Sequence, residues 1–239
     1  MAAVGYRNHA AANVGATRAT SLSVGKPTGT VEGDLMVAII CCNNGTVTIT
    51  APGDWTAAAT NPTNGAGNTI ATFYRVAGAS EGASYSFGVG VTTRSIAGTI
   101  VSLTGVNVAD PEDVGSETLG DVSPIVIPAL SLAAGYEIVI CSVALSGSAG
   151  QVGATTPPAG FTELVDQNTT TGLTEVTQGV GYKQFAAAGD TGSLTYTIDL
   201  SGGTSRIGIA FAANVGADII VDSTGIARFD RIRSRRTSW

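Results

Sequence analysis

The chain has 239 residues and a formal net charge of −6; 44% of its residues are apolar, 13% are charged and only 6% are aromatic. A chain of this length can bury one large core or two ordinary ones, so we expect a folded protein. The excess of small and β-branched residues is typical of short strands joined by tight turns. The longest apolar run, residues 35–42, is far shorter than the roughly 20 residues of a membrane-spanning helix. We therefore expect a soluble protein without a membrane partner.

Strand signals recur along the first half of the chain. Runs of β-branched and aromatic residues, each bounded by Gly, Pro, Asn or Asp, predict strands at residues 20–24, 35–42, 46–50, 69–77, 84–89 and 97–103. Residues 106–124 then hold five acids and no base, a composition that predicts a linker or a long surface connection. Strand signals resume at residues 124–132, 136–145, 177–186, 193–200 and 206–215. No sustained helical periodicity is present, so we expect little helix.

The two halves of the chain resemble each other in the order and spacing of their segments. The stretch "APGDWT" corresponds to "PPAGFT", and "EGDLMVAII" corresponds to "AGYEIVICS". A third match pairs Tyr74 with Tyr182 and Arg75 with Lys183, and the offset between halves varies only from 102 to 109 residues. We therefore predict an internal duplication and an all-β fold of two tandem antiparallel β-sandwich or jelly-roll-like units. One intertwined sandwich is the competing architecture.

The expected domains follow from this division. A first sandwich unit with an N-terminal arm covers residues 1–105, an acidic linker covers 106–123, a second sandwich unit covers 124–215, and a C-terminal segment with a basic arm covers 216–239. The first fifteen residues lack the basic region and apolar stretch of a signal peptide, so we expect synthesis and first folding in the cytoplasm.

Few residues could carry redox or metal chemistry. Cys41, Cys42 and Cys141 cannot all pair within one chain, and their surroundings favour roles as small apolar strand residues over a disulfide or redox role. With one histidine, His9, and no Cys-x-x-Cys spacing, a transition-metal site would lack ligands. We expect no metal and no cofactor.

A series of motifs resembles a known group of proteins. "GDLMVAI" after a Pro-Thr-Gly step, then "ITAPGDWT", "YRVAGASEGASYSF" and "IVSLTGVN" leading into "DPED", is similar to the β-rich structural proteins of tailed-bacteriophage virions, of the minor tail, fibre-associated or head decoration type. The resemblance covers mainly residues 20–112 and continues more weakly to about residue 214. It implies a non-enzymatic component of the virion, on capsid or tail, made in the host cytoplasm. Its partners would be other virion proteins and copies of itself, as in a homo-oligomer.

This chain departs from long phage fibres, because it has no Gly-X-Y run, no heptads for a trimeric stalk and no large tip domain. A compact accessory protein on the head or tail, such as a decoration (cement) protein, is therefore favoured over a receptor-binding fibre.

Acidic residues are the first candidates for catalysis, and we expect none of them to be catalytic. Asp54 beside Trp55, or Asp110, Glu112 and Asp113, could supply the paired carboxylates of a glycosidase. However, Asp54 is a typical turn residue, and the aligned position in the second half is Gly160.

A serine hydrolase would depend on His9 alone, with no nucleophile-elbow sequence near it. The glycine-rich stretches lack the spacing of a phosphate loop. A hydrolase therefore remains only a third hypothesis.

Trp55 and Phe161 occupy matching places after the two turns. A large ring in such a place is typical of a core residue that closes a small sandwich. The alternative is a sugar-stacking platform, which would make the protein a carbohydrate-binding adhesion module on the virion surface, with glycans as partners. Both interpretations stay open at this point.

The last twelve residues contrast in charge with the rest of the chain. They hold five arginines and one aspartate, a local charge of +4, whereas residues 1–227 hold seven basic and seventeen acidic residues, a charge of −10. The candidate partner-binding residues are Arg228, Arg231, Arg233, Arg235, Arg236 and Trp239. We favour an arm that docks on acidic protein groups, because arginine donates forked hydrogen bonds to carboxylates. A disordered end is the alternative, and nucleic-acid binding is disfavoured by the acidic body.

Overall fold

The computed structural model describes residues 3–59, 67–90, 94–120, 123–148, 153–169, 174–199 and 205–216, together with the backbone of 219–221 and 227–229. Every regular element in these ranges is a β-strand, and all pairings are antiparallel. The predicted all-β class is therefore confirmed for the described part of the chain.

The first unit is built on a five-stranded sheet, sheet 1, with the strand order β1-β7-β3-β5-β4. Its strands are β1 (Gly5–Asn13), β3 (Leu35–Cys42), β4 (Thr56–Ala57), β5 (Thr69–Val76) and β7 (Ile96–Thr104). A small sheet of β2 (Ser21–Gly25) and β6 (Ser84–Gly88) covers the outer face of sheet 1. Side chains in β2 and β6 alternate between exposed and buried, as expected for strands with one face on a core.

The second unit is built on sheet 2, with the order β13-β14-β11-β17-β8. Its strands are β8 (Glu112–Gly120), β11 (Glu137–Ser148), β13 (Thr162–Asn168), β14 (Thr174–Phe185) and β17 (Ser205–Ala213). A sheet of β9 (Ile125–Ile127), β12 (Thr155–Thr156) and β16 (Leu194–Ile198) covers its outer face. Two further pairs are β10 (Ser131–Leu132) with β15 (Gly189–Asp190), and β18 (Ile219–Val221) with β19 (Ala227–Phe229).

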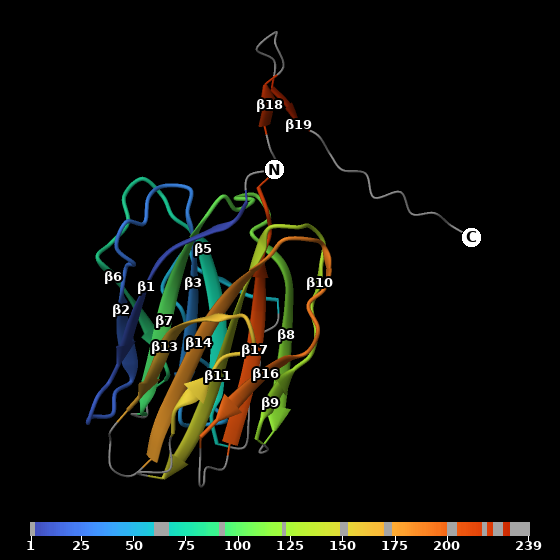
Figure 1. The fold of residues 1–239 in the computed structure, drawn as a ribbon. Helices are drawn as coiled ribbons and strands as arrows, with labels where there is room; N and C mark the ends of the chain where they lie inside the picture. Colours follow the sequence, from blue (N-terminus) through green and yellow to red (C-terminus); the bar gives the residue numbers. More distant parts are fainter. Residues whose placement is uncertain are drawn as a thin grey trace.

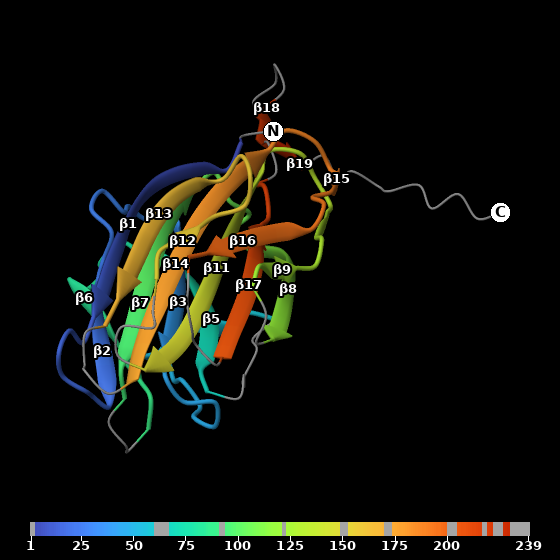
Figure 2. The same ribbon diagram turned by 60° about the horizontal axis from the view of Figure 1, so that its bottom comes forward.

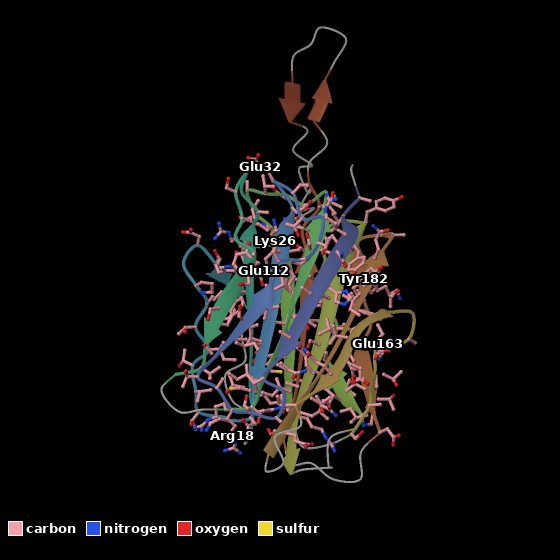
Figure 3. The ribbon with its side chains drawn as sticks, turned by 90° about the vertical axis from the view of Figure 1, so that its left-hand side faces the viewer. Arg18, Lys26, Glu32, Glu112, Glu163 and Tyr182 are labelled. Carbon is pink, nitrogen blue, oxygen red and sulfur yellow. The ribbon has the colours of Figure 1, made fainter. Side chains whose placement is uncertain are left out.

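The two large sheets pack face to face around a central core. Val37 and Ile39 of β3 contact the same apolar cluster as Ile140 of β11 and Ile207 of β17. The outer faces of the sheets form two further cores with the small sheets, so that the molecule has four layers (Figures 1 and 2). In the side view of Figure 3, Lys26 lies on the side of sheet 1 and Glu163 on the side of sheet 2. Because both faces of β3 are covered, all eight of its residues are buried.

Polar side chains cross the central interface as well. Gln178 of β14 is fully buried and donates from Nε2 to the carbonyl of Ile39 at 2.9 Å. Its Oε1 accepts from Thr99 Oγ1 at 2.8 Å and from Gln167 Nε2 at 2.9 Å. These bonds fix the register of sheet 2 on sheet 1, because any slip would leave buried polar groups without partners.

Sheets 1 and 2 have corresponding strand orders. The strand order of sheet 1, β1-β7-β3-β5-β4, corresponds position by position to the order of sheet 2, β8-β17-β11-β14-β13. Leu35 lies opposite Leu103 in sheet 1, and Ile138 lies opposite Ala213 in sheet 2. Common ancestry of the two units by duplication agrees with this order and stays a prediction.

The strand registers correct one detail of the predicted alignment. Leu35 also lies opposite Val76, and Ile138 opposite Gln184, so Ile138 rather than Glu137 is the counterpart of Leu35. A shift of one residue exchanges the two faces of a strand. Glu137 therefore corresponds to Asp34.

Three local predictions were wrong. The expected linker contains β8, which pairs with β17 along the edge of sheet 2. The expected N-terminal arm contains β1, the edge strand of sheet 1. The strand expected at residues 46–50 is reduced to a single bridge between Thr50 and Gly88. Acidic or alanine-rich edge strands lack the apolar pattern on which strand prediction depends, since they pair on one side only.

Candidate functional site

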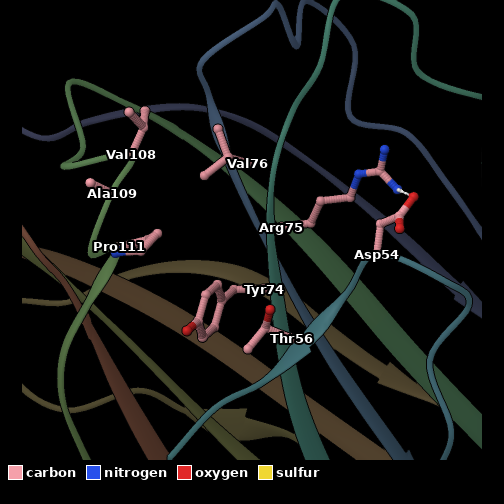
Figure 4. Close-up of a pocket in the computed structure, with 8 residues that line it drawn as sticks. All are labelled: Asp54, Thr56, Tyr74, Arg75, Val76, Val108, Ala109 and Pro111. Carbon is pink, nitrogen blue, oxygen red and sulfur yellow. Dashed lines mark ion pairs between the residues drawn. The ribbon is translucent and has the colours of Figure 1, made fainter.

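A pocket of about 450 Å³ lies at the junction of the two units (Figure 4). One side is formed by β4 and β5, and the other by the connection that leads from β7 to β8 (Figure 4). The lining residues are Asp54, Thr56, Tyr74, Arg75, Val76, Val108, Ala109 and Pro111. We call it the Tyr74 pocket.

The turn that contains Asp54 sets the rim of this pocket. Asp54 has a φ of 68°, and its counterpart Gly160 has a φ of 78°. Left-handed backbone of this kind favours glycine and is tolerated by aspartate. The Asp54 carboxylate is 86% exposed and lies 3.6 Å from Nη1 of Arg75. The position of Asp54 is therefore explained by its role as a turn residue that forms one surface ion pair.

Arg75 is held by a second and tighter partner. Its Nε donates to Oε1 of Glu81 at 3.2 Å, and Nη2 lies 3.1 Å from the same oxygen. Tyr85 donates its hydroxyl to Oε2 of Glu81 at 2.7 Å. Burial alone would raise the pKa of Glu81, but hydrogen bonds from Gly78 and Tyr85 and the charge of Arg75 hold it below its ordinary value. Glu81 is therefore ionised at neutral pH and fixes the guanidinium.

Tyr74 forms the base of the pocket beside two further carboxylates. Its ring lies 5.9 Å from the ring of Phe211, which anchors it on the central core. Burial raises the pKa of the Tyr74 hydroxyl, and Glu112 and Asp110 raise it further. Four acids, Asp54, Glu81, Asp110 and Glu112, thus act on this part of the surface against the single guanidinium of Arg75. This excess of carboxylates favours a neutral or cationic group over an anion.

Two of the three acids of the expected linker have separate backbone partners. Glu112 accepts the backbone N–H of Ala59 at 3.0 Å, whereas Asp113 accepts the N–H of Ala133 at 2.9 Å. Burial raises the pKa of Glu112, and Asp110 raises it further. The separate partners of Glu112 and Asp113 favour structural roles for these two carboxylates.

Trp55 and Phe161 both pack inward. The Trp55 ring lies edge-on to Tyr85 at 5.1 Å and to Phe87 at 5.5 Å, on the core between sheet 1 and its small sheet. Phe161 lies edge-on to Phe185 at 6.2 Å, on the matching core of the second unit. Both rings are half-buried, so each has a structural contact and some exposed surface. Whether either ring binds sugar stays a prediction.

A second, smaller hollow of about 260 Å³ lies at the edge of the second unit, and its lining residues are Gly153, Ala154, Asp166, Gln167 and Asn168. Its carboxylate already accepts two hydrogen bonds from Thr155, one from the backbone N–H at 3.3 Å and one from Oγ1 at 3.2 Å. This hollow offers less chemistry than the Tyr74 pocket.

The cysteines and His9 are placed away from any hollow. Cys41, Cys42 and Cys141 are buried free thiols, which confirms their interpretation as apolar strand residues, and burial raises the pKa of each thiol. His9 Nδ1 lies 2.7 Å from the hydroxyl of Tyr6.

Two kinds of feature are absent from the residues that the structure describes. They contain no group of three or more His, Cys, Asp or Glu side chains arranged to hold a metal ion. In the same ranges, no helix is long and apolar enough to span a membrane.

The predicted basic arm is only partly placed. Arg228 lies in β19, of which the backbone is described. Arg231, Arg233, Arg235, Arg236 and Trp239 lie outside the described residues. Docking by this arm therefore stays a prediction.

Sequence reasoning found the turn and its aromatic residue but missed the Tyr74 pocket. The "YRVAGASEGASY" stretch does contain Tyr74, Arg75, Glu81 and Tyr85, which span the connection from β5 of sheet 1 to β6 of the small sheet. The opposite wall, at Val108 and Pro111, could not be expected while residues 106–123 were interpreted as a linker.

Comparisons of the chain with protein-family models, with curated proteins and with solved structures found no match. The class that the fold itself defines is an all-β protein of two face-to-face antiparallel sheets, each with a smaller sheet on its outer face.

Proposed function

We propose that this protein is a non-enzymatic structural component of a tailed-bacteriophage particle, of the head decoration or minor tail type. It binds other virion proteins and further copies of itself through its β faces and its terminal segments. The phage context is supported by the sequence resemblance over residues 20–112. The assembly role is supported by the distribution of charge.

The observation that carries the assembly role is this charge separation. The acids around the Tyr74 pocket outnumber its one base, while the last twelve residues carry a charge of +4. Exposed Val108, next to Pro111, adds an apolar rim at which Phe229 or Ile232 could pack. Arginine pairs well with carboxylates and stacks on aromatic rings such as Tyr74. The Tyr74 pocket is thus a fitting acceptor for the basic segment of a neighbouring copy.

The first experiment removes residues 228–239 and measures association of the purified chain with host-phage particles by co-sedimentation. We expect association to be lost while the thermal unfolding midpoint stays unchanged, because the described residues of the three cores all precede residue 216. Undiminished association of the shortened chain would refute docking by this segment.

The second experiment removes charge from the acceptor. Asp54→Gly combined with Asp110→Asn takes two negative charges from the pocket region, and glycine suits the left-handed backbone at Asp54. Glu163→Gln with Asp199→Asn is the matched control, since both side chains are exposed and belong to the second unit. We expect the first pair to weaken association at least about tenfold, as the loss of roughly 1.4 kcal/mol does. Equal association of the two double variants with the particles would mean that the acceptor lies elsewhere.

A second candidate function is glycan adhesion. The Tyr74 pocket places an aromatic ring beside a carboxylate, a guanidinium and a hydroxyl, which are groups that recognise sugar hydroxyls. Trp55 adds a half-exposed ring at the same turn. Glycan-array binding by the full chain that disappears in a folded Asp54→Gly or Trp55→Ala variant would favour this function. Array binding that is absent throughout would leave virion assembly as the proposal.

A further inference from the structure

An ion pair between a partly exposed arginine and a buried aspartate fixes the start of sheet 1. Arg7 lies in a β-bulge between Tyr6 and Asn8, where the register of β1 on β7 shifts. Its Nη2 donates to Oδ1 of Asp34 at 2.9 Å, and its Nε contacts Oδ2 of the same carboxylate. Asp34 also accepts the backbone N–H of Val31 at 2.9 Å and is only 3% exposed. The carboxylate therefore links the edge strand β1 to the turn before β3.

The second unit has two acids in the corresponding place. The register of β8 on β17 shifts at the place that corresponds to the bulge in β1. Asp113 is therefore the counterpart of Arg7. Glu137 stands where Asp34 does, and its Oε1 accepts the N–H of Ala134 at 2.9 Å, as Asp34 accepts that of Val31. The two carboxyl groups accept the N–H groups of adjacent residues, Ala133 for Asp113 and Ala134 for Glu137, and Asp113 is close enough to raise the pKa of Glu137. The cation of the first unit is thus replaced by a second carboxyl group.

Two ionised carboxylates cannot account for this contact. Glu137 is fully buried, and within the described ranges no N–H or O–H group donates to its Oε2. Between two carboxylates a hydrogen bond needs a proton, since ionised oxygens only accept. A proton on Oε2 of Glu137 would satisfy that oxygen, create the donor for Asp113 and remove the repulsion between like charges.

The neighbouring elements bring no other group into this contact. Glu112, beside Asp113 on β8, accepts the N–H of Ala59 instead. Lys183 on β14 places Nζ 4.7 Å from the ring centre of Phe185. Asp190 on β15 accepts the N–H of Gly192 at 2.7 Å. The titratable groups on the packed elements therefore have separate partners.

We propose that Asp113 and Glu137 share one proton and form a pH-sensitive latch between the start of β8 and the turn before β11. When the proton is present, the latch holds β8 to that turn. When it is lost, the negative charges of buried Glu137 and half-buried Asp113 face each other and the contact opens. The segment that leads into β8 carries Val108 and Pro111, so the latch also steadies one wall of the Tyr74 pocket. The proposal does not depend on a phage function.

The direction of the pH dependence follows from the carboxyl of Glu137. Burial raises its pKa to about 8, and the hydrogen bond and charge of Asp113 act in the same direction. Since the folded pKa lies above the ordinary value of about 4.3, the folded state holds more protons than the unfolded state between these two values. The stabilising contribution is complete below about pH 4 and is lost as the pH rises through the folded pKa.

The direct test is carbon NMR of the full-length chain labelled at its glutamate carboxyl groups. One resonance is expected to titrate near pH 8 and to disappear in Glu137→Gln, whose amide can still donate to Asp113. Titration of every glutamate below about pH 6 would overturn the proposal.

Exchange of the matched residues supplies the second test. Asp113→Arg rebuilds the pair of the first unit, so the fall in urea midpoint expected of the wild type between about pH 4 and 8 should vanish. Arg7→Asp creates a carboxyl pair with Asp34 and should add a second fall. If Asp113→Arg does not fold, Glu137→Gln decides the matter, because the same pH dependence in this variant as in the wild type would refute the latch.

Discussion

The buried amide of Gln178 offers a sharp test of how the two sheets are joined. Gln178→Leu keeps the size of the side chain but removes three hydrogen bonds, of which those with Ile39 and Thr99 cross the central interface and that from Gln167 lies within sheet 2. The carbonyl of Ile39 and the hydroxyl of Thr99 then lose a partner in a buried site. Three lost bonds at about 1 kcal/mol each, plus the cost of buried groups left without partners, predict a destabilisation of about 3–5 kcal/mol.

The assay is urea unfolding followed by circular dichroism, with the free energy taken from midpoint and slope. Thr99→Val alone should cost about 1 kcal/mol, and the double variant should cost less than the sum of the two by a similar amount, because one bond is lost in both. Strict additivity, or a Gln178→Leu chain within about 1 kcal/mol of wild type, would refute the reasoning.

Three further predictions concern single positions. Gly33→Ala should destabilise the protein by about 1 kcal/mol in thermal melts, because Gly33 has a φ of 84°. Tyr136→Gly at the matching position should cost little, because Tyr136 already bears the strain of a φ of 65°. Equal costs of the two substitutions would contradict this reasoning. Trp55→Ala should lower stability by about 2–3 kcal/mol in urea titrations, through lost contacts with the core of the first unit, and an unchanged midpoint would mark a surface ring. The buried thiols should resist iodoacetamide in the native protein at neutral pH and react after denaturation, as followed by mass spectrometry. The reason is that burial hinders access and raises the pKa of Cys42 to about 11. Fast labelling of the native protein would contradict the burial of Cys42.

The interior strands could be predicted from the sequence, and the edge strands could not. β3, β5 and β7 have apolar residues that fill cores, so composition identifies them. β1 and β8 lie at sheet edges, where one side of the backbone and many side chains meet solvent. Their Ala-, Asn- and acid-rich sequences therefore resemble loops.

The sequence contains a pattern that indicates the packing of sheet 1 on sheet 2. An apolar run without alternation, such as "LMVAIICC", indicates a strand covered on both faces. That pattern is at odds with two separate sandwiches joined by a linker, because such a unit would leave one face of β3 in water.

The candidate sites depend on pairings that local sequence does not contain. The matched turns correctly paired Asp54 with Gly160, since both residues have left-handed backbone; that the Asp54 carboxylate is dispensable stays a prediction. The contact of Asp113 with Glu137 became visible only through the strand register, because a one-residue slip in the predicted alignment had paired Glu137 with Leu35.

The shared central core has a consequence for biosynthesis. The inner face of sheet 1 is complete once β7 has been made, but its cover includes β17, which ends at Ala213. At roughly 5–20 residues per second, the first unit leaves the ribosome with a bare apolar face for several seconds. Neighbouring nascent chains could then pair through like faces. Thr99 and the carbonyl of Ile39 oppose this mispairing, because their partner Gln178 belongs to the second unit and has no copy on the first.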